Sequence, residues 1–261
     1  ADRMELCKET HMVKRKVMKH AFSIGMLPFA AQPKDPSNPE SAPIWDIDRQ
    51  SLNIGFIGLN EAVKIHTGKE MHDSQDAWTF GLRVIKAMVD VKKRYAEETG
   101  LKWGIVQTPA ETLTYRLANI DMKKFGEAAF VQGNRESGSV YYTNSSHVRV
   151  SADVPLLERI KIESSFHALT GGGAIAHIFM GEAYPDTDAL DKLNRKIATE
   201  TLASYWAMTK DITHCFGCNS TMGGAVTACP NCGSTHVEVY SRVTGYMQRV
   251  NGFNAGKQQE W

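Results

Sequence analysis

Apolar residues recur along this chain at two spacings, one typical of helices and one typical of strands. Helical spacing puts Trp78 and Ile85 on one face of a helix that Ser74 or Asp73 can cap and Gly100 can end. A short apolar run at 103–107 predicts a buried strand. The same reasoning predicts further helices at 1–22, at 59–66, from about 108 onward, and from Asp186 or Thr187 to about Tyr205. It predicts further strands at 51–58, at 174–180, near 210–213 and at 236–243. Strands therefore alternate with helices up to residue 206, which predicts an α/β fold with a mainly parallel, barrel-like sheet.

Two stretches lack such a pattern. Residues 27–46 contain five prolines, which exclude a helix or a sheet interior and predict a long irregular segment. Residues 126–150 are polar and are expected to be rich in loops. Beyond residue 206 the chain becomes rich in cysteine and glycine. We therefore divide it into residues 1–206, 207–236 and 237–261.

Composition and charge exclude several classes of protein. The chain has 261 residues, with 30 Lys and Arg against 29 Asp and Glu, so its formal net charge of +1 gives no global attraction to nucleic acid or membranes. No apolar run reaches the roughly 18 residues of a membrane span. Residues 1–20 are charged throughout, unlike a signal peptide. We expect a cytoplasmic protein without membrane or nucleic-acid partners.

Four of the five cysteines form a compact motif, C-x2-C-x10-C-x2-C, made by Cys215, Cys218, Cys229 and Cys232. Two such paired turns can supply four thiolates to one tetrahedral zinc ion, and a filled shell predicts a structural rather than a catalytic site. A pair of redox dithiols and a rubredoxin-like iron site are the alternatives. His214 and His236 flank the motif and are expected not to be ligands.

The segment Arg242–Tyr246 (RVTGY) follows the cysteines directly, and 253–258 (FNAGKQ) comes soon after. Together with LNIGFIGLNE at 52–61, TGLKWGIVQTPAETLTYR at 99–116 and YYTNSSH at 141–147, this arrangement resembles anaerobic (class III) ribonucleoside-triphosphate reductases. The resemblance covers nearly the whole chain. It implies the C-terminal part of a glycyl-radical-enzyme α/β barrel in residues 1–206, a small zinc-ribbon-like module in 207–236, and the radical loop and tail in 237–261.

The resemblance also implies the chemistry. Gly245 would store a radical on its α-carbon, where a planar centre shared with the adjoining amide groups leaves no room for a β-carbon. An activase that uses S-adenosylmethionine and an iron–sulfur cluster would install this radical. The assembled enzyme would replace the 2′ hydroxyl of ribonucleoside triphosphates with hydrogen, supplying deoxyribonucleotides for DNA replication. Glu111 would lie near the substrate and assist proton transfer, although its ordinary role is to favour the positive end of a helix.

In the family, a cysteine on a finger-like loop becomes the transient thiyl radical, and the matched region does not contain that loop. Cys7 lacks its context and is expected to be an ordinary buried thiol. We therefore expect the C-terminal half of a reductase, either one piece of a split enzyme or a fragment. Its expected partners are the N-terminal half, the activase and a second copy in a dimer. The electron donor, formate or a thioredoxin-like protein, stays open.

Other functions fit the sequence less well. A zinc-ribbon module on an α/β platform could bind nucleic acid or protein, but residues 206–261 carry a net charge of only +1. A pyruvate formate-lyase relative would lack the four cysteines beside the glycine. Gly171–Ala176 matches G-x-G-x-x-A, but these glycines precede a predicted strand instead of opening a helix, so we reject a dinucleotide site.

Overall fold

The computed structural model describes residues 2–181, 183–243 and 245–261 of the chain. Its α-helices are α1 (Asp2–Ser23), α2 (Leu59–Thr67), α3 (Gln75–Thr99), α4 (Glu111–Phe125), α5 (Leu156–Ser164), α6 (Thr187–Glu200) and α7 (Ala255–Glu260). Its strands are β1 (Leu52–Phe56), β2 (Trp103–Gln107), β3 (Gln132–Asn134), β4 (Ser139–Tyr141), β5 (Ala176–Phe179), β6 (Trp206–Thr209), β7 (Ile212–Cys215), β8 (Thr221–Gly223), β9 (Val237–Ser241) and β10 (Gln248–Arg249). Short 3-10 turns lie at Ile47–Arg49, Gly126–Ala128, His167–Leu169 and Val250–Gly252.

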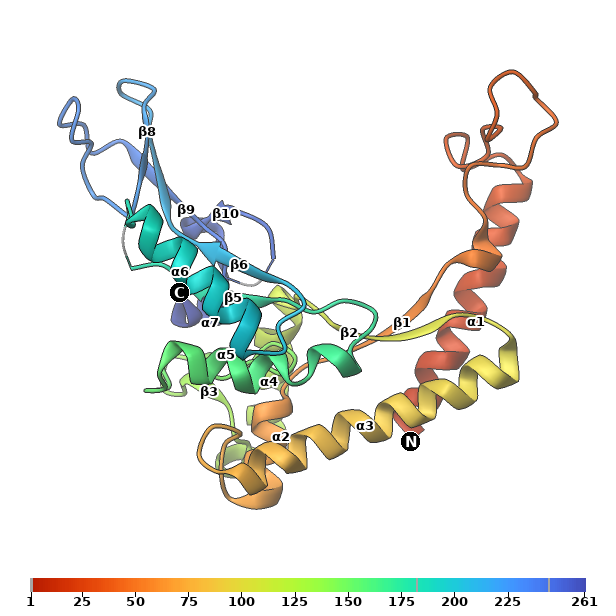
Figure 1. Ribbon diagram of the computed structural model, residues 1–261, viewed down its shortest axis with the longest axis horizontal. Helices are drawn as coiled ribbons and strands as arrows, with labels where there is room; N and C mark the ends of the chain where they lie inside the picture. The colour runs from red at the N-terminus through yellow and green to blue at the C-terminus, as the bar shows by residue number, and fades with distance from the viewer. Residues whose placement is uncertain (1, 182, 244) are drawn as a thin grey trace.

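The first parallel pair joins β1 to β2, with Leu52 opposite Trp103. The long helix α3 connects α2 to β2 and runs beneath the β1–β2 pair in Figure 1. Ser74 caps α3 by accepting a hydrogen bond from the Ala77 backbone, and Gly100 ends it in a left-handed conformation, as the sequence predicts. Buried side chains from α1, α3 and both strands form one core, which includes Met4, Tyr95 and Ile105.

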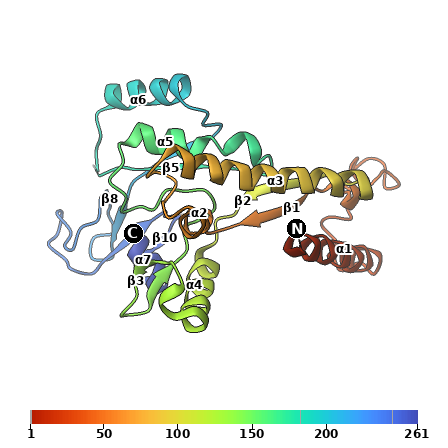
Figure 2. The same ribbon diagram turned by 90° about the horizontal axis from the view of Figure 1, so that it is seen from below.

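A second parallel pair joins β5 to β6. Helices α5 and α6 pack with it through Ile160, Ile178 and Ile197, which are all buried. Figure 2 shows α5 and α6 on the side of the molecule away from α4. In the described part of the chain, β1–β2 and β5–β6 are separate two-stranded sheets, so they do not form a closed barrel. The α/β prediction is confirmed, whereas a barrel is not formed by these residues alone.

A glycine-rich segment connects the two pairs. The Gly172 amide donates to the carbonyl of Ile105 at 2.8 Å, and the Gln107 amide donates to the carbonyl of Gly173 at 2.9 Å. A β-carbon on Gly172 would come within 2.9 Å of the Ile105 oxygen and 2.8 Å of Asn53 Oδ1, so this approach requires glycine. Gly172 therefore serves close packing against β2, and the three glycines precede strand β5 as predicted.

The cysteine-rich segment and the C-terminal tail share one antiparallel sheet in the order β10–β9–β7–β8. Strand β7 pairs with both β8 and β9, and β9 pairs with β10. Val243, Val250 and Phe253 form a small core beside it. The last helix, α7, then packs against β4 and α4. The sheet therefore ties the cysteines to the strand that leads to Gly245.

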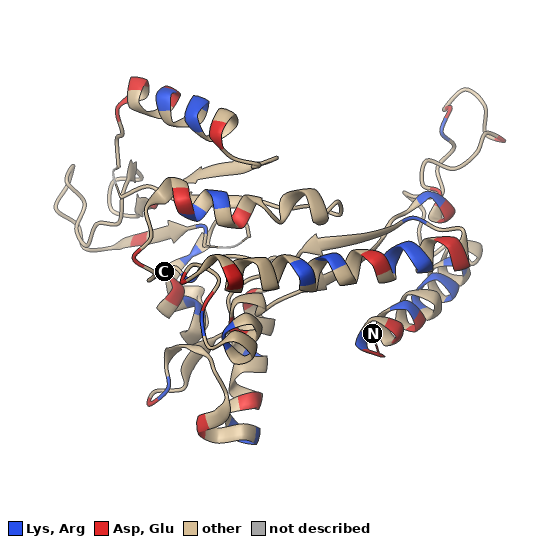
Figure 3. Ribbon diagram, turned by 60° about the horizontal axis from the view of Figure 1, so that its bottom comes forward, with Lys and Arg blue, Asp and Glu red and all other residues tan. Residues whose placement is uncertain are grey.

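Helix α1 and the irregular segment after it extend away from the C-terminal sheet (Figure 1). Residues 27–46 contain neither helix nor regular strand, as their prolines predict, although Pro33 and Pro43 form an isolated bridge. Several apolar side chains of this arm are exposed, among them Val13, Val17, Met26 and Phe29. Acidic and basic residues are interspersed along α1 and α3 in Figure 3. Among the described residues, no helix is long and apolar enough to cross a bilayer.

Two expectations were wrong in detail. Helix α6 ends at Glu200 instead of near Tyr205, because the residues that follow bind other elements: Leu202 N donates to Ser164 Oγ and Ser204 N to His167 Nδ1. The strand expected near 210–213 is β7, and a further strand, β6, lies just before it. The polar stretch 126–150 is mostly loop, as expected, and also contains the short hairpin β3–β4.

Candidate functional site

A cavity of about 860 Å³ lies between the two parallel pairs and the C-terminal tail. The end of β2 contributes Gln107 and Thr108, and the segment before β5 contributes Ala174 and Ile175. From the tail come Arg242 and Gly245. Residues that the sequence separates by more than half the chain therefore face one space.

The loop between β4 and α5 forms the polar wall of this cavity. Asn144 Oδ1 accepts a hydrogen bond from the Ala110 backbone at 2.8 Å, just before α4, and Gln107 Nε2 donates to Ser146 Oγ at 2.7 Å. Ser145 adopts a positive φ of 44° and donates to the carbonyl of Phe56 at 3.1 Å. All three loop side chains are buried. Their hydrogen bonds hold β1, β2 and α4 together, and Asn144 and Ser145 also line the cavity.

Gly245 borders the cavity and lies against the start of α4. A β-carbon at Gly245 would come within 2.9 Å of Glu111 Oε1 and 3.8 Å of the Pro109 β-carbon. The Arg242 guanidinium donates a hydrogen bond from Nε to the carbonyl of Gly245. Of the two residues between them, Thr244 lies outside the described residues. Gly245 is thus held on its carbonyl side and has no room for a side chain on the Glu111 side.

Glu111 is the first residue of α4, where its carboxylate favours the positive helix end. Pro109 lies two residues earlier, so it precedes the helix instead of occupying its first turn. Ala110, at the cap position, offers no side-chain hydrogen bond. The Glu111 side chain faces the tail, and it is not among the residues that line the large cavity. The structure therefore brings Glu111 and Gly245 together, with Glu111 at the side of the cavity.

A second, much smaller cavity of about 20 Å³, room for one water molecule, lies behind the first. His147 lines both cavities, and Glu163 and Glu260 line the smaller one. Burial, together with the positive charge of Arg159, lowers the pKa of His147 to about 4, so this imidazole is neutral at pH 7. Burial raises the pKa of Glu163 and of Glu260 to about 7. Nothing in the sequence pattern singles out these two acids, since only the fold buries them.

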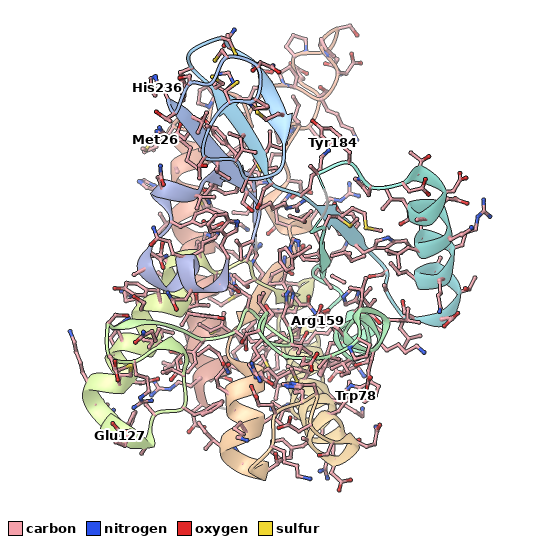
Figure 4. All side chains as sticks on the ribbon, turned by 90° about the vertical axis from the view of Figure 1, so that its left-hand side faces the viewer. Met26, Trp78, Glu127, Arg159, Tyr184 and His236 are labelled. Atoms are coloured by element: carbon pink, nitrogen blue, oxygen red, sulfur yellow. The ribbon has the colours of Figure 1, made fainter. Side chains whose placement is uncertain are left out.

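The four cysteines come together at the end of the C-terminal sheet, where Figure 4 shows sulfur atoms near the labelled His236. The ligand atoms of Cys215, Cys218, Cys229 and Cys232 all lie within 4.8 Å of one another. The Cys215–Cys232 sulfurs are 3.7 Å apart and the Cys218–Cys229 sulfurs 3.6 Å apart. Tetrahedral zinc with bonds of about 2.3 Å requires sulfurs about 3.8 Å apart. The donor set and its spacing therefore fit zinc.

The surroundings of the cysteines agree with this fit. Burial opposes ionisation of the Cys229 thiol, but hydrogen bonds from the backbone of Cys232 and Asn231 outweigh it and lower its pKa to about 6. The pKa of Cys232 is raised instead, because the neighbouring cysteine sulfurs outweigh a hydrogen bond from the Ser234 backbone. A thiolate is the form that binds metal. His236 stacks on Phe216 with ring centroids 4.9 Å apart, and His214 meets the same ring edge-on at 4.8 Å. Neither histidine belongs to the four-sulfur group, as the sequence predicts.

Comparison with known proteins gives a consistent result. The family model described as anaerobic ribonucleoside-triphosphate reductase matches residues 1–261. The chain is 30% identical over 231 residues to the anaerobic ribonucleoside-triphosphate reductase of Haemophilus influenzae, covering 84% of this chain and 31% of that protein. It is 27% identical over 276 residues to the corresponding protein of Enterobacteria phage T4, covering 99% of this chain and 42% of that protein.

Solved structures agree with the sequence matches. The anaerobic ribonucleotide reductase from Thermotoga maritima with MES in the active site superposes with a TM-score of 0.77 and 26% identity, over 97% of this chain and 39% of that one. The complex of that enzyme with dATP and CTP shares the fold with a TM-score of 0.77 at 24% identity, over 100% of this chain and 40% of that one. The chain thus spans less than half the length of these relatives. It belongs to the anaerobic ribonucleoside-triphosphate reductase family.

Proposed function

We propose that this chain is the glycyl-radical portion of an enzyme that reduces ribonucleoside triphosphates to 2′-deoxyribonucleotides. Gly245 stores the radical and passes it to a thiyl cysteine on an N-terminal portion. The observation that carries this proposal is the position of Gly245, in the RVTGY motif, at the edge of a cavity of about 860 Å³. Asn144, Ser145 and His147 give that cavity a polar wall for a substrate.

The immediate surroundings of Gly245 suit a carbon-centred radical. Its α-carbon is fixed by the Arg242 contact to its carbonyl and by the carboxylate of Glu111. Fixed neighbours keep the glycine backbone in one arrangement, which a planar, delocalised centre requires. The proton-transfer role of Glu111 stays a prediction. Its contacts with Gln248 and Lys257 support a role in holding the tail in place.

We infer that the cysteine module binds one structural zinc ion through Cys215, Cys218, Cys229 and Cys232. With all four positions filled by protein sulfur, the metal would supply rigidity and leave no open position for substrate. Because β7 pairs with β9, that rigidity extends to the strand before Gly245. A reducing cytoplasm would keep the thiolates available.

The remaining partners are proposals of the same kind. The exposed apolar side chains of the α1 arm, with Val13 and Val17 each 60% exposed and Phe29 76% exposed, support a covering surface from the N-terminal portion. The two parallel pairs would then become part of a complete barrel. An activase that uses S-adenosylmethionine and an iron–sulfur cluster installs the radical, and the assembled enzyme is a dimer. The division at residues 206 and 236 also stays a prediction, and β6 spans the first of these boundaries.

Electron paramagnetic resonance of the anaerobically activated, assembled enzyme tests the proposal. We expect an organic radical whose splitting by one α-hydrogen collapses when glycine is deuterated. Exposure to air should then cut the chain at Gly245, and denaturing mass spectrometry should detect residues 246–261 as a separate peptide. Cleavage at Gly252 or Gly256 would assign the radical to another residue, and a proven radical without cleavage would contradict the glycyl assignment.

A further inference from the structure

The C-terminal tail contacts Glu111 repeatedly. Gln248 Nε2 donates to Glu111 Oε2 at 2.5 Å, and Lys257 Nζ pairs with Glu111 Oε1 at 2.5 Å. Asn254 Nδ2 donates to the Glu111 backbone carbonyl at 3.1 Å. Gly245 completes the set, since its α-carbon faces the same Oε1 atom. Four residues of the tail therefore meet at one residue of α4.

Lys257 is the buried member of this group. Its side chain is only 3% exposed, and that of Glu111 is 19% exposed. The Lys257 ammonium group lies 4.9 Å from the centre of the Phe253 ring, which belongs to the small core of the tail. A buried ammonium group needs a charged partner, because an uncompensated charge is costly to keep away from water. The ion pair therefore makes the docked position of α7 depend on Glu111.

Helix α7 approaches β4 and α4 so closely that a side chain at Gly256 would clash with them. A β-carbon on Gly256 would come within 2.7 Å of the Val140 carbonyl and 2.9 Å of Tyr115 Cδ2. Gly256 thus lets α7 lie directly on β4 and α4, and the next residue, Lys257, is carried to the carboxylate. The sequence N-A-G-K at 254–257 therefore supplies the glycine for close packing and the lysine for the ion pair. Its first residue, Asn254, caps the helix with its side chain.

We propose that Lys257 is a positioning residue for the radical site: through its ion pair with Glu111 it latches the tail to α4 and so fixes where Gly245 lies. This rests on the proposed role of Gly245. In this proposal the role of Glu111 is to hold the radical loop in place through its pair with Lys257. The latch also predicts that the loop leaves the cavity edge when the pair breaks.

Hydrogen–deuterium exchange of the assembled enzyme before activation tests the latch without needing a radical. Lys257→Met keeps the apolar stem and removes the charge, so amides of residues 246–261 should exchange at least about tenfold faster. Lys257→Arg should stay close to the unmodified protein. Arg249→Met is the matched control, because it removes another tail ion pair, with Glu238, whose arginine is 62% exposed. Amide exchange in Arg249→Met should match that of the unmodified protein, because exposed ion pairs contribute little to stability.

A double variant tests whether the two residues act through each other. Lys257→Met added to Glu111→Gln should accelerate exchange no further than the faster single variant, because the pair is already broken. Exchange in Lys257→Met within about twofold of the unmodified protein would overturn the latch, as would additive effects or equal acceleration by Lys257→Arg. After activation, Lys257→Met should lose its radical to dioxygen faster. Absence of any radical in the unmodified enzyme would count against the role of Gly245 and leave the exchange result standing.

Discussion

Glu111 and Gly245, far apart in the sequence, are in contact at the edge of the cavity, and a β-carbon on Gly245 would come within 2.9 Å of Glu111 Oε1. Lys257 and Gln248 restrain that carboxylate, so the space beside it leaves no room for a side chain at Gly245.

Gly245→Ala should therefore abolish the radical and also lower the free energy of unfolding, by about 1–3 kcal/mol. The extra methyl must displace Glu111, which is measurable as a lower urea midpoint. Adding Glu111→Asp shortens the opposing side chain and should recover part of this stability without restoring the radical signal. A return of the signal in the double variant would show that sterics alone, and not the need for a side-chain-free α-carbon, explain the loss.

Replacing Cys215 by serine should remove the zinc. Anaerobically prepared protein should contain about one zinc per chain, and the variant almost none, because tetrahedral coordination needs all four sulfurs. Loss of the metal should loosen β7 and β9 and prevent radical formation at Gly245. Elemental analysis with hydrogen exchange measures both effects. Cys7→Ser is the control, since Cys7 lies on α1 and should leave metal content unchanged. Protein containing neither zinc nor iron would refute the metal site.

Glu260 predicts a pH dependence of tail stability. Burial raises its pKa to about 7, opposed by the charge of Lys257 and by the nearby Asn144 side chain. The folded state thus favours the protonated acid, and this stabilisation is complete below the unfolded pKa of about 4.3 and is lost as the pH rises through 7. The stability of Glu260→Gln relative to the unmodified protein should therefore increase by up to about 3 kcal/mol between pH 5 and pH 8.

Comparing the two proteins at each pH is necessary because other groups oppose this trend. His147 has a pKa lowered to about 4, so its contribution to stability is lost as the pH falls from 6.5 toward 4. Urea midpoints of both proteins at pH 5, 6, 7 and 8 would isolate the Glu260 effect. A constant difference across this range would mean that Glu260 stays ionised in the folded protein.

The exposed apolar face of α1 should bind the N-terminal portion. Val13→Asp with Val17→Asp puts charges on two side chains that are each 60% exposed, so the stability of this chain should change little. Association with the N-terminal portion should weaken by about tenfold or more, measured by analytical ultracentrifugation. Ile65→Asp alters an equally exposed residue on α2 and serves as the control. Unchanged association in the double variant would place the interface elsewhere.

Features that depend on nearby residues were predictable from sequence. Ser74 and Gly100 cap α3 as expected, because a cap is made by the helix's own backbone. The end of α6 was misjudged because Ser164 and His167, from another part of the chain, bind the residues that follow it. The cysteine quartet was evident from its spacing, whereas the Lys257–Glu111 pair was not, since it arises only when α7 docks on α4.

The way the tail is fastened has a consequence for oxygen damage. Beyond Gly245, several contacts attach the chain to the rest of the protein: among them, β10 pairs with β9, Lys257 pairs with Glu111, and Trp261 Nε1 donates to the Asp211 carboxylate at 3.3 Å. A backbone cut at Gly245 breaks none of them. The severed peptide would remain seated in the native protein and separate only on unfolding. A damaged molecule would therefore keep its shape and its partners while having lost its radical, and would compete with intact copies during assembly.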